Sequence, residues 1–127
     1  MREAEELIKI LEKAERVFVL TGAGVSTPSG IPDFRGKGGL YERISPEVFS
    51  IERFKQDPSF FYRQIGPMLK IILDAEPNPA HYLIANLENR GKVNLVATQN
   101  IDGLHQKAGS RKIVELHGTL ELSLIHI

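Results

Sequence analysis

A short apolar strand that runs directly into a pair of glycines is the feature that most constrains this 127-residue chain. Residues 16–21 (Arg-Val-Phe-Val-Leu-Thr) are rich in β-branched and aromatic types and stop at Gly22, which predicts a buried strand of the parallel type. Gly22-Ala23-Gly24 follows as a tight turn, and a short helix is predicted from Val25 onward. This order of elements indicates an α/β domain whose first turn closely approaches a ligand.

The turn resembles a dinucleotide-binding fingerprint but departs from it in two respects. Thr27 occupies the third glycine position of G-x-G-x-x-G, and no second strand carries the acidic residue with which a dehydrogenase binds ribose. These departures argue against hydride transfer. Taken alone, Gly22-Ala23-Gly24 is as compatible with an ordinary turn as with a phosphate-binding loop.

Helical and strand patterns alternate along the rest of the chain. Periodicity and turn residues predict helices over 2–15, 51–73, 79–90 and 101–108, and strands over 93–98 and 112–116. Asn78 is the predicted N-cap before Pro79, and a break is expected near Gly66-Pro67. Residues 28–46 are rich in Pro and Gly, which predicts a long loop. The fold class is therefore α/β: a Rossmann-like parallel sheet of about three strands with flanking helices.

Composition excludes several classes of protein. The chain has no cysteine and hence no thiolate metal site, and its four histidines lack metal-ligand spacing, so no bound metal is expected. Sixteen basic residues balance sixteen acidic ones, which argues against direct binding of nucleic acid. The charged N-terminal segment is unlike a signal peptide, and no apolar run is long enough to span a membrane. We therefore expect a cytoplasmic protein.

Residues 22–36 (Gly-Ala-Gly-Val-Ser-Thr-Pro-Ser-Gly-Ile-Pro-Asp-Phe-Arg-Gly) closely resemble the signature of the sirtuins, the NAD-dependent protein lysine deacylases. Three further stretches match that family: residues 98–105 (Thr-Gln-Asn-Ile-Asp-Gly-Leu-His), 116–118 (Leu-His-Gly) and 77–81 (Pro-Asn-Pro-Ala-His). The resemblance predicts a partial NAD-binding domain of sirtuin type over residues 1–121, and it leaves residues 122–127 as an unmatched tail.

The resemblance implies NAD as cofactor and an acetylated lysine of a protein or peptide as substrate. His117 would be the general base that deprotonates the NAD ribose, and Asn100 would order the ribose and a water near the reacting carbon. Both residues follow predicted strands, at the end of the sheet where α/β proteins bind ligands. Without the resemblance, the default interpretation of His117 is a strand-end histidine, and that of Asn100 and Asp102 is an Asx turn that ends a strand.

The cofactor-binding set implied by the resemblance spans both long motifs. It consists of Gly22, Ala23, Gly24, Thr27, Ile31, Asp33, Phe34, Arg35, Gln99, Asn100, Ile101, Asp102 and His117. In this set Asp102 would bind the nicotinamide carboxamide beside Ile31, and Phe34 would shield the sugar carbon. Arg35 would bind the pyrophosphate with its planar fork. The alternative reading makes Phe34 a packing anchor and Arg35 a surface charge.

The other aromatic and histidine side chains are interpreted as structural. His81 and His105 are assigned structural roles, and the aromatic residues of the helical region are assigned to packing. The aromatic residues concerned are Phe54, Phe60, Phe61 and Tyr62.

Complete sirtuins are roughly twice this length and continue into two Cys-x-x-Cys pairs that bind a structural zinc, then into the peptide-binding and adenosine-binding strands. Nothing in this chain matches those segments, so we expect a truncated sirtuin, without zinc module or C-terminal strands, that is weakly active or inactive. The alternative is a non-catalytic fragment that binds NAD or ADP-ribose; a mono-ADP-ribosyl transferase is a third reading.

Sirtuin branches that prefer acidic acyl groups carry a Tyr-x-x-Arg pair. The segment Tyr62-Arg63-Gln64-Ile65 has no Arg at that spacing, so acetyl-lysine is favoured.

Overall fold

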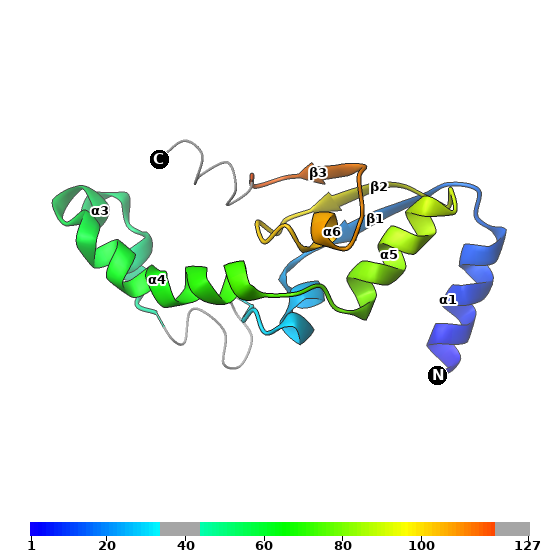
Figure 1. Cartoon of the computed structure of the whole chain (residues 1–127), viewed down its shortest axis with the longest axis horizontal. Helices are drawn as coiled ribbons and strands as arrows, with labels where there is room; N and C mark the ends of the chain where they lie inside the picture. The colour runs from blue at the N-terminus through cyan, green and yellow to red at the C-terminus, as the bar shows by residue number, and fades with distance from the viewer. Residues whose placement is uncertain (34–43, 119–127) are drawn as a thin grey trace. The chain divides into compact units, whose positions relative to one another are not determined.

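A computed structural model describes residues 1–33 and 44–118. The chain divides into two compact units, the first containing Met1–Gly22 and the segment from Pro77 onward, and the second containing Ala23–Glu76. The first unit is built on three strands, β1 (Val17–Thr21), β2 (Val93–Thr98) and β3 (Ile113–Glu115). They pair in parallel in the order β1-β2-β3 (Figure 1). The predicted parallel α/β sheet of three strands is confirmed.

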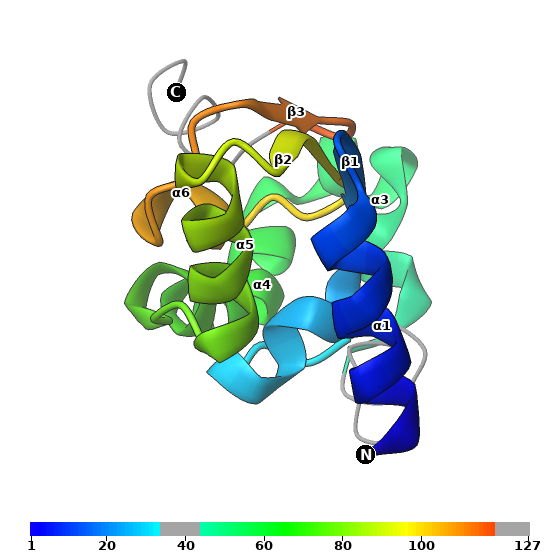
Figure 2. The same ribbon diagram turned by 90° about the vertical axis from the view of Figure 1, so that its right-hand side faces the viewer.

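Three helices accompany this sheet: α1 (Arg2–Lys13), α5 (Pro79–Asn89) and α6 (Leu104–Lys107). Helices α5 and α6 lie on the same side of the sheet in two perpendicular views (Figures 1 and 2). The Lys92 ammonium, just before β2, donates hydrogen bonds to the carbonyls of Glu12 and Ala14 at 3.0 and 2.8 Å. A cation at the last carbonyls of a helix complements the helix dipole. Lys92 therefore connects the end of α1 to the start of β2.

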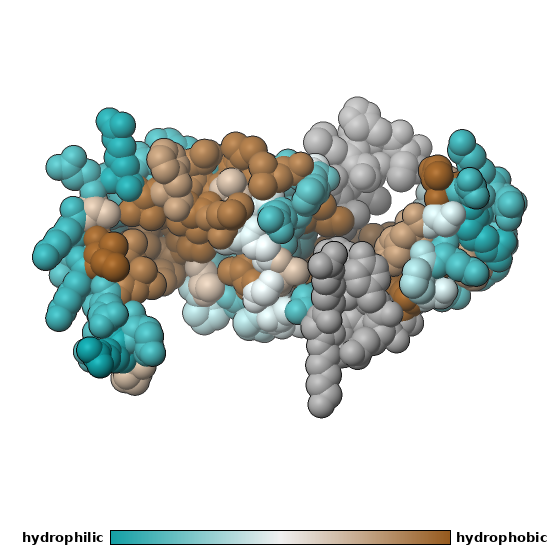
Figure 3. Space-filling view, turned by 180° about the vertical axis from the view of Figure 1, so that it is seen from behind, coloured by the Kyte–Doolittle hydropathy of each residue, from teal (hydrophilic) through white to brown (hydrophobic). Residues whose placement is uncertain are grey.

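The two faces of the sheet differ sharply in burial. On the face toward α5, Val96 is fully buried and Thr98 is 3% exposed. On the opposite face, Phe18 and Leu20 of β1 are 71% and 68% exposed. Seen from behind, apolar side chains gather over the part of the molecule that contains the sheet (Figure 3). Parallel sheets normally bury both faces, so this face is an apolar surface that no described element of its unit covers.

Helix α5 begins with a complete N-cap. The Asn78 side chain accepts a hydrogen bond from the Ala80 amide at 2.9 Å, and the Asn78 amide donates one to His81 Nδ1 at 3.1 Å. These reciprocal bonds form a capping box, with His81 at the position where Glu or Gln is usual. Pro79 takes the first helical position. The predicted helix start is confirmed, and the histidine in it has a structural role.

The second unit is helical. It contains two short 3₁₀ segments, Ala23–Ser29 and Pro46–Phe49, followed by α3 (Ile51–Gln56) and α4 (Pro58–Asp74). The short helix predicted from Val25 is thus a 3₁₀ segment that begins two residues earlier. The predicted long loop over 28–46 is only partly within the described residues.

The expected helix break near Gly66-Pro67 is wrong, because the break falls at Asp57. Asp57 precedes a proline, which disfavours helical geometry, and its backbone is non-helical with φ −148° and ψ 86°. Pro58 then starts α4, and Pro67 lies inside the continuous helix. Ile65 and Met68 on either side of Pro67 are buried in the apolar cluster of this unit, so packing outweighs local propensity there.

That apolar cluster is formed by Ile44, Val48, Ile65 and Met68. Phe60 and Phe61 pack against it, and the Phe61 ring meets Phe54 and Tyr62 edge to face at centroid distances of 5.4 Å. Edge-to-face pairs at this distance are favourable. The prediction that these aromatic residues serve packing is confirmed.

Candidate functional site

A row of polar side chains crosses the carboxyl end of the sheet. Thr21 pairs in register with Thr98, and Thr98 with Glu115. The ladder continues one residue further, since the Gln99 amide donates to the Thr21 carbonyl at 3.0 Å and the Leu116 amide to the Thr98 carbonyl at 2.9 Å. The residues that follow each strand therefore leave the sheet at the same edge, where open α/β sheets bind ligands.

Asn100 is held at two points of this edge. Its backbone amide donates to Thr98 Oγ1 at 3.1 Å, and its side-chain Nδ2 donates to the Gly22 carbonyl at 2.9 Å. Gly22 also faces Gln99, because a Cβ at position 22 would lie 3.4 Å from Gln99 Oε1. The structure thus brings the first glycine of the turn together with the polar residues after β2.

Asp102 forms an Asx turn directly before the next helix. Its Oδ1 accepts a hydrogen bond from the Leu104 amide at 3.0 Å, and Gly103 between them has φ +70°. The helix predicted over 101–108 is consequently shorter, beginning at Leu104, because left-handed geometry at Gly103 interrupts it. The Asx-turn reading of Asp102 describes its local geometry, and its role toward a carboxamide stays a prediction.

His117 lies in the turn directly after β3 and is exposed. The turn closes through the Gly118 amide, which donates to the Glu115 carbonyl at 3.2 Å, and Gly118 has φ +81°. Positive φ strains other residue types, so glycine at position 118 lets the chain turn away immediately after the histidine. Its imidazole is therefore presented at the carboxyl edge of the sheet.

The loop residues of the predicted site belong to the second unit. Thr27 Oγ1 donates to the Gly24 carbonyl at 3.0 Å, and the Gly30 amide donates to the Thr27 carbonyl at 3.0 Å, which fixes the 3₁₀ segment. Ile31 and Asp33 complete its described part, whereas Phe34 and Arg35 lie outside the described residues.

Glycine at position 24 has no local structural cause. Its φ is not in the left-handed region, and an added Cβ would meet no described atom within 4 Å. Neither backbone strain nor packing among the described residues therefore requires a glycine there.

Behind the strand ends lies a pair of buried histidines. His81 is fully buried and His105 is 1% exposed, and their rings meet edge to face at 5.0 Å. His105 Nε2 is 2.9 Å from Thr21 Oγ1, which donates to Thr98 Oγ1 at 2.8 Å. Burial lowers the pKa of both imidazoles, His81 lowers the pKa of His105 further, and Asp102 opposes both shifts.

The sequence-predicted residues thus divide between the units. Those that follow the strand ends lie in the first unit: Gly22, Gln99, Asn100, Ile101, Asp102 and His117. The others described, Ala23, Gly24, Thr27, Ile31 and Asp33, lie in the second. The sequence analysis did not predict the hydroxyl pair Thr21–Thr98. Its only signal in the sequence was that the first two strands, β1 and β2, both end in threonine. The described part of the chain contains no cluster of three or more His, Asp or Glu that could hold a metal ion.

Comparison with known proteins decides the family. Residues 22–123 match the model of the Sir2 family. The chain belongs to the Sir2 family. It is 50% identical over 120 residues to an NAD-dependent protein deacetylase of Saccharolobus solfataricus and 50% identical over 117 residues to one of Thermotoga maritima. These alignments cover 94% and 92% of this chain and 47% and 48% of the relatives, so the chain spans about half the length of the relatives it matches.

Solved structures give the same family and the same fold. A point mutant of a Sir2 homologue in complex with ADP ribose superposes with a TM-score of 0.83 at 42% identity, covering 91% of this chain and 47% of that one. A Sir2 enzyme studied for its mechanism and regulation superposes with a TM-score of 0.79 at 51% identity, covering 90% and 45%. The Rossmann-like architecture of the Sir2 family is therefore confirmed. No helix in the described ranges has the length and apolar character needed to cross a bilayer.

Proposed function

We propose that this chain supplies the NAD-binding and general-base half of an NAD-dependent protein lysine deacetylase. The observation that carries the proposal is that Gly22, Asn100 and His117 follow the carboxyl ends of three neighbouring parallel strands in a member of the Sir2 family. The Sir2 homologue bound to ADP ribose shares this fold with a TM-score of 0.83, which supports the same ligand class here.

The strand-end residues have the chemistry that an NAD ribose and carboxamide require. Asn100 and Gln99 offer uncharged amides, and Asp102 offers a carboxylate that accepts hydrogen bonds. The open space beside Gly24 suits the close approach of a pyrophosphate. NAD, when bound, supplies the electrophilic sugar carbon and the nicotinamide leaving group. The residues of the chain would bind and orient it, with Asp33 and the residues Phe34 and Arg35 completing the predicted set.

In this proposal His117 accepts the proton of a ribose hydroxyl. The His117 imidazole is exposed at the sheet edge, and an imidazole nitrogen is a suitable proton acceptor for a ribose hydroxyl. Asn100 would orient the ribose, because its carboxamide is fixed to the Gly22 carbonyl and its backbone to Thr98. A fixed polar group loses little freedom when its ligand binds, which favours an ordered reactive geometry.

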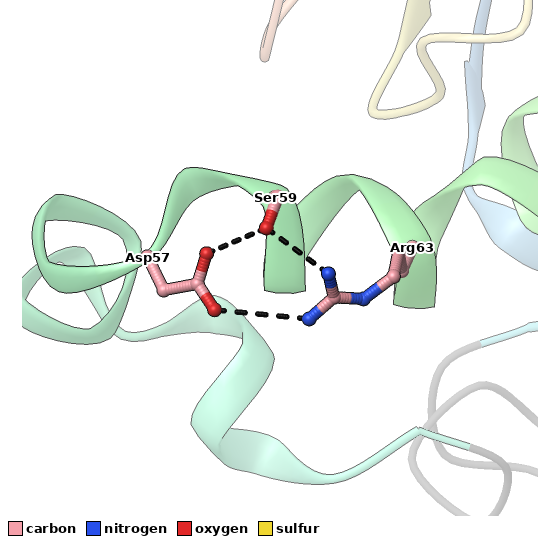
Figure 4. A network of polar contacts seen from close by, with 3 residues as sticks. All are labelled: Asp57, Ser59 and Arg63. Carbon is pink, nitrogen blue, oxygen red and sulfur yellow. Dashed lines mark hydrogen bonds and ion pairs between the residues drawn. The ribbon is translucent and has the colours of Figure 1, made fainter.

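We further propose that acetyl-lysine is the preferred substrate and that the protein acts in the cytoplasm. Position 65, three residues after Tyr62, is taken by Ile65, which is buried in the apolar cluster of the second unit. The nearby Arg63 is engaged with Asp57 and Ser59 on the exposed side of α4 (Figure 4). No cation thus occupies the position at which acidic acyl groups are bound in related branches. Solved relatives include a Sir2 complex with a deacetylated p53 peptide, which fits a protein substrate.

The test is calorimetric titration of the 127-residue chain with NAD and with ADP-ribose. We expect saturable binding that weakens on the order of tenfold in Asn100→Ala, because a ligand hydrogen bond is lost. Asn86→Ala, an exposed position on α5, is the matched control and should bind as the parent does. Absence of binding to either ligand would overturn the proposal.

Turnover separates the proposal from its alternative, a non-catalytic NAD or ADP-ribose binding fragment. The alternative is favoured by one observation: the chain spans about half the length of its relatives. Mass spectrometry of an acetyl-lysine peptide incubated with NAD and the chain distinguishes the two. Deacetylated peptide and free nicotinamide, with the deacetylated peptide lost in His117→Ala, would support catalysis; binding without either product would support the alternative.

A further inference from the structure

A continuous chain of polar contacts runs through the interior of the first unit to Asn100. It begins at the edge-to-face pair His81–His105, passes from His105 Nε2 to Thr21 Oγ1 at 2.9 Å, and continues from Thr21 to Thr98 at 2.8 Å. Thr98 Oγ1 then accepts the Asn100 amide at 3.1 Å. Thr21 and Thr98 are 7% and 3% exposed, so these contacts are shielded from water. Hydrogen bonds in such surroundings are directional and costly to leave unmade.

The proton positions in this chain follow from its geometry. The Thr21 hydroxyl donates to Thr98, so its oxygen is left to accept a hydrogen from His105 Nε2. His105 is therefore the neutral tautomer with its hydrogen on Nε2, and Nδ1, buried without a hydrogen-bond partner, is a lone-pair atom. A second proton on Nδ1 would be a buried donor with no acceptor. The lowered pKa of His105 agrees with this assignment.

Thr98 is the point at which this interior chain meets the proposed site. Its hydroxyl oxygen receives the Thr21 hydroxyl from the interior and the Asn100 amide from the edge. The Asn100 side chain in turn donates to the Gly22 carbonyl at 2.9 Å, which connects the end of β2 to the start of the glycine turn. Asn100 thus has its backbone fixed by Thr98 and its carboxamide fixed by Gly22.

We propose that His105 and Thr98 are positioning residues for the NAD site. His105 acts through Thr21 to orient the Thr98 hydroxyl. That hydroxyl holds the Asn100 backbone, and with it the contact between Asn100 and Gly22, in the ligand-binding geometry. The inference rests on the proposed function for its ligand, but the positioning of Asn100 is a property of the chain alone. Neither His105 nor Thr98 is assigned contact with the ligand. Their effect on binding passes through Asn100.

The test compares Thr98→Val, which keeps the shape of the side chain but removes the hydroxyl, with Thr98→Ser, which keeps the hydroxyl. Both are made in the full chain labelled with ¹⁵N. We expect the Asn100 amide of Thr98→Val to exchange with solvent at least about tenfold faster and ADP-ribose to bind on the order of tenfold more weakly, because the amide loses its acceptor. Thr98→Ser should match the parent in both measurements, and His105→Gln should show a smaller change of the same sign.

Val93→Ala controls for general destabilisation. Val93 is 2% exposed in the same strand but at its opposite end, so its truncation weakens the sheet without touching the polar chain. We expect Val93→Ala to leave the ADP-ribose affinity of the folded fraction and the Asn100 resonances unchanged. Equal loss of ADP-ribose affinity in Val93→Ala and Thr98→Val would overturn the inference that Thr98 positions Asn100, and would leave Thr98 only a role in stability.

The two proposals fail in distinguishable ways. If the parent chain binds no ADP-ribose, the proposed function fails, and exchange at the Asn100 amide alone decides the positioning. If the parent binds but Thr98→Val leaves both the exchange and the affinity unchanged, the positioning inference fails and the proposed function stands.

Discussion

The two units of this chain are ordered by different kinds of interaction. Apart from Ser26, the buried polar side chains of the described residues all belong to the first unit: Thr21, Asn78, His81, Thr98, His105 and Ser110. Hydrogen bonds join Thr21 to Thr98 and to His105, and Asn78 to His81, whereas the buried Ser110 hydroxyl has no hydrogen-bond partner in the described part of the chain. The second unit is centred on an apolar cluster, whose stabilisation is large but not directional. The comparison teaches that the first unit adds a directional set of buried hydrogen bonds to its buried apolar side chains, such as Val96 and Leu104, whereas the second unit relies mainly on buried apolar volume.

Truncation inside the apolar cluster should have the largest effect. Met68→Ala removes a side chain that is 8% exposed, and we expect a loss of about 2 to 5 kcal/mol in the free energy of unfolding of the second unit. Denaturant titration followed by amide signals of each unit measures it. Leu73→Ala, at a position of α4 that is 51% exposed, is the control and should cost much less. Equal losses in both variants would contradict the assigned core.

Acidification should act on the first unit. The pKa of His81 and of His105 is lowered in the folded state from the ordinary 6.5, so below that value the unfolded chain binds more protons than the folded one. The contribution of these neutral histidines to the free energy of unfolding is therefore fully present above pH 6.5. It falls as the pH decreases below that value, by at most about 1.4 kcal/mol per pH unit for each histidine. Asp102, the acidic group acting on both rings, reduces the fall.

Urea unfolding between pH 7.5 and pH 5 checks this dependence in the signals of the first unit. His105→Gln should flatten it, whereas His117→Gln, at an exposed position, should retain it. A slope that is the same in the parent and in His105→Gln would show that other groups cause the dependence.

Removal of a single helix cap should have an intermediate effect. Asn78→Ala leaves the Ala80 amide at the start of α5 without its acceptor, and we expect a loss of about 1 kcal/mol. Asn78→Ser keeps an acceptor oxygen at the N-cap and should lose only a small part of that. The thermal unfolding midpoints of the two variants give the comparison, and equal midpoints would mean that the capping box contributes little to stability.

The exposed ion network of the second unit should matter least. Asp57, Ser59 and Arg63 interact at the start of α4, and the Ser59 hydroxyl is the main cause of the lowered pKa of Asp57 (Figure 4). These side chains are exposed, so solvent screens their interaction. Arg63→Ala should leave the unfolding midpoint unchanged within error, as should Lys70→Ala, which breaks the comparable pair with Asp74. A clear decrease in Arg63→Ala alone would show that the network contributes to α4.

The sequence predicted the sheet, its parallel strands and the cap of α5, because these depend on local patterns: an apolar run before glycine, or Asn followed by Pro. It misplaced the break in the helical region, because tertiary packing on either side of Pro67 outweighed local propensity. The capping role of His81 was hidden because the usual partner is Glu or Gln.

The candidate site was predictable in its residues but not in its connections. The positions of Asn100 and His117 after strands place them at one edge of any parallel sheet. The contact of Thr21 with Thr98 depends on strand register, and that of His105 with Thr21 depends on how α6 packs. The hydrophobic pattern fixes the face to which a strand residue points, but the residue it pairs with and the packing of α6 depend on segments far apart in the chain.

The sheet face that carries the exposed side chains of Phe18 and Leu20 has a consequence for handling the protein in solution. Phe18 and Leu20 present apolar surface on a chain whose net charge is zero at pH 7. With no electrostatic repulsion to keep molecules apart, attraction between such faces grows with concentration. Light scattering should therefore rise with protein concentration most steeply near the isoelectric point of about 6.9 and less at pH 8.5. The titrations proposed above are best made in the dilute, mildly alkaline regime.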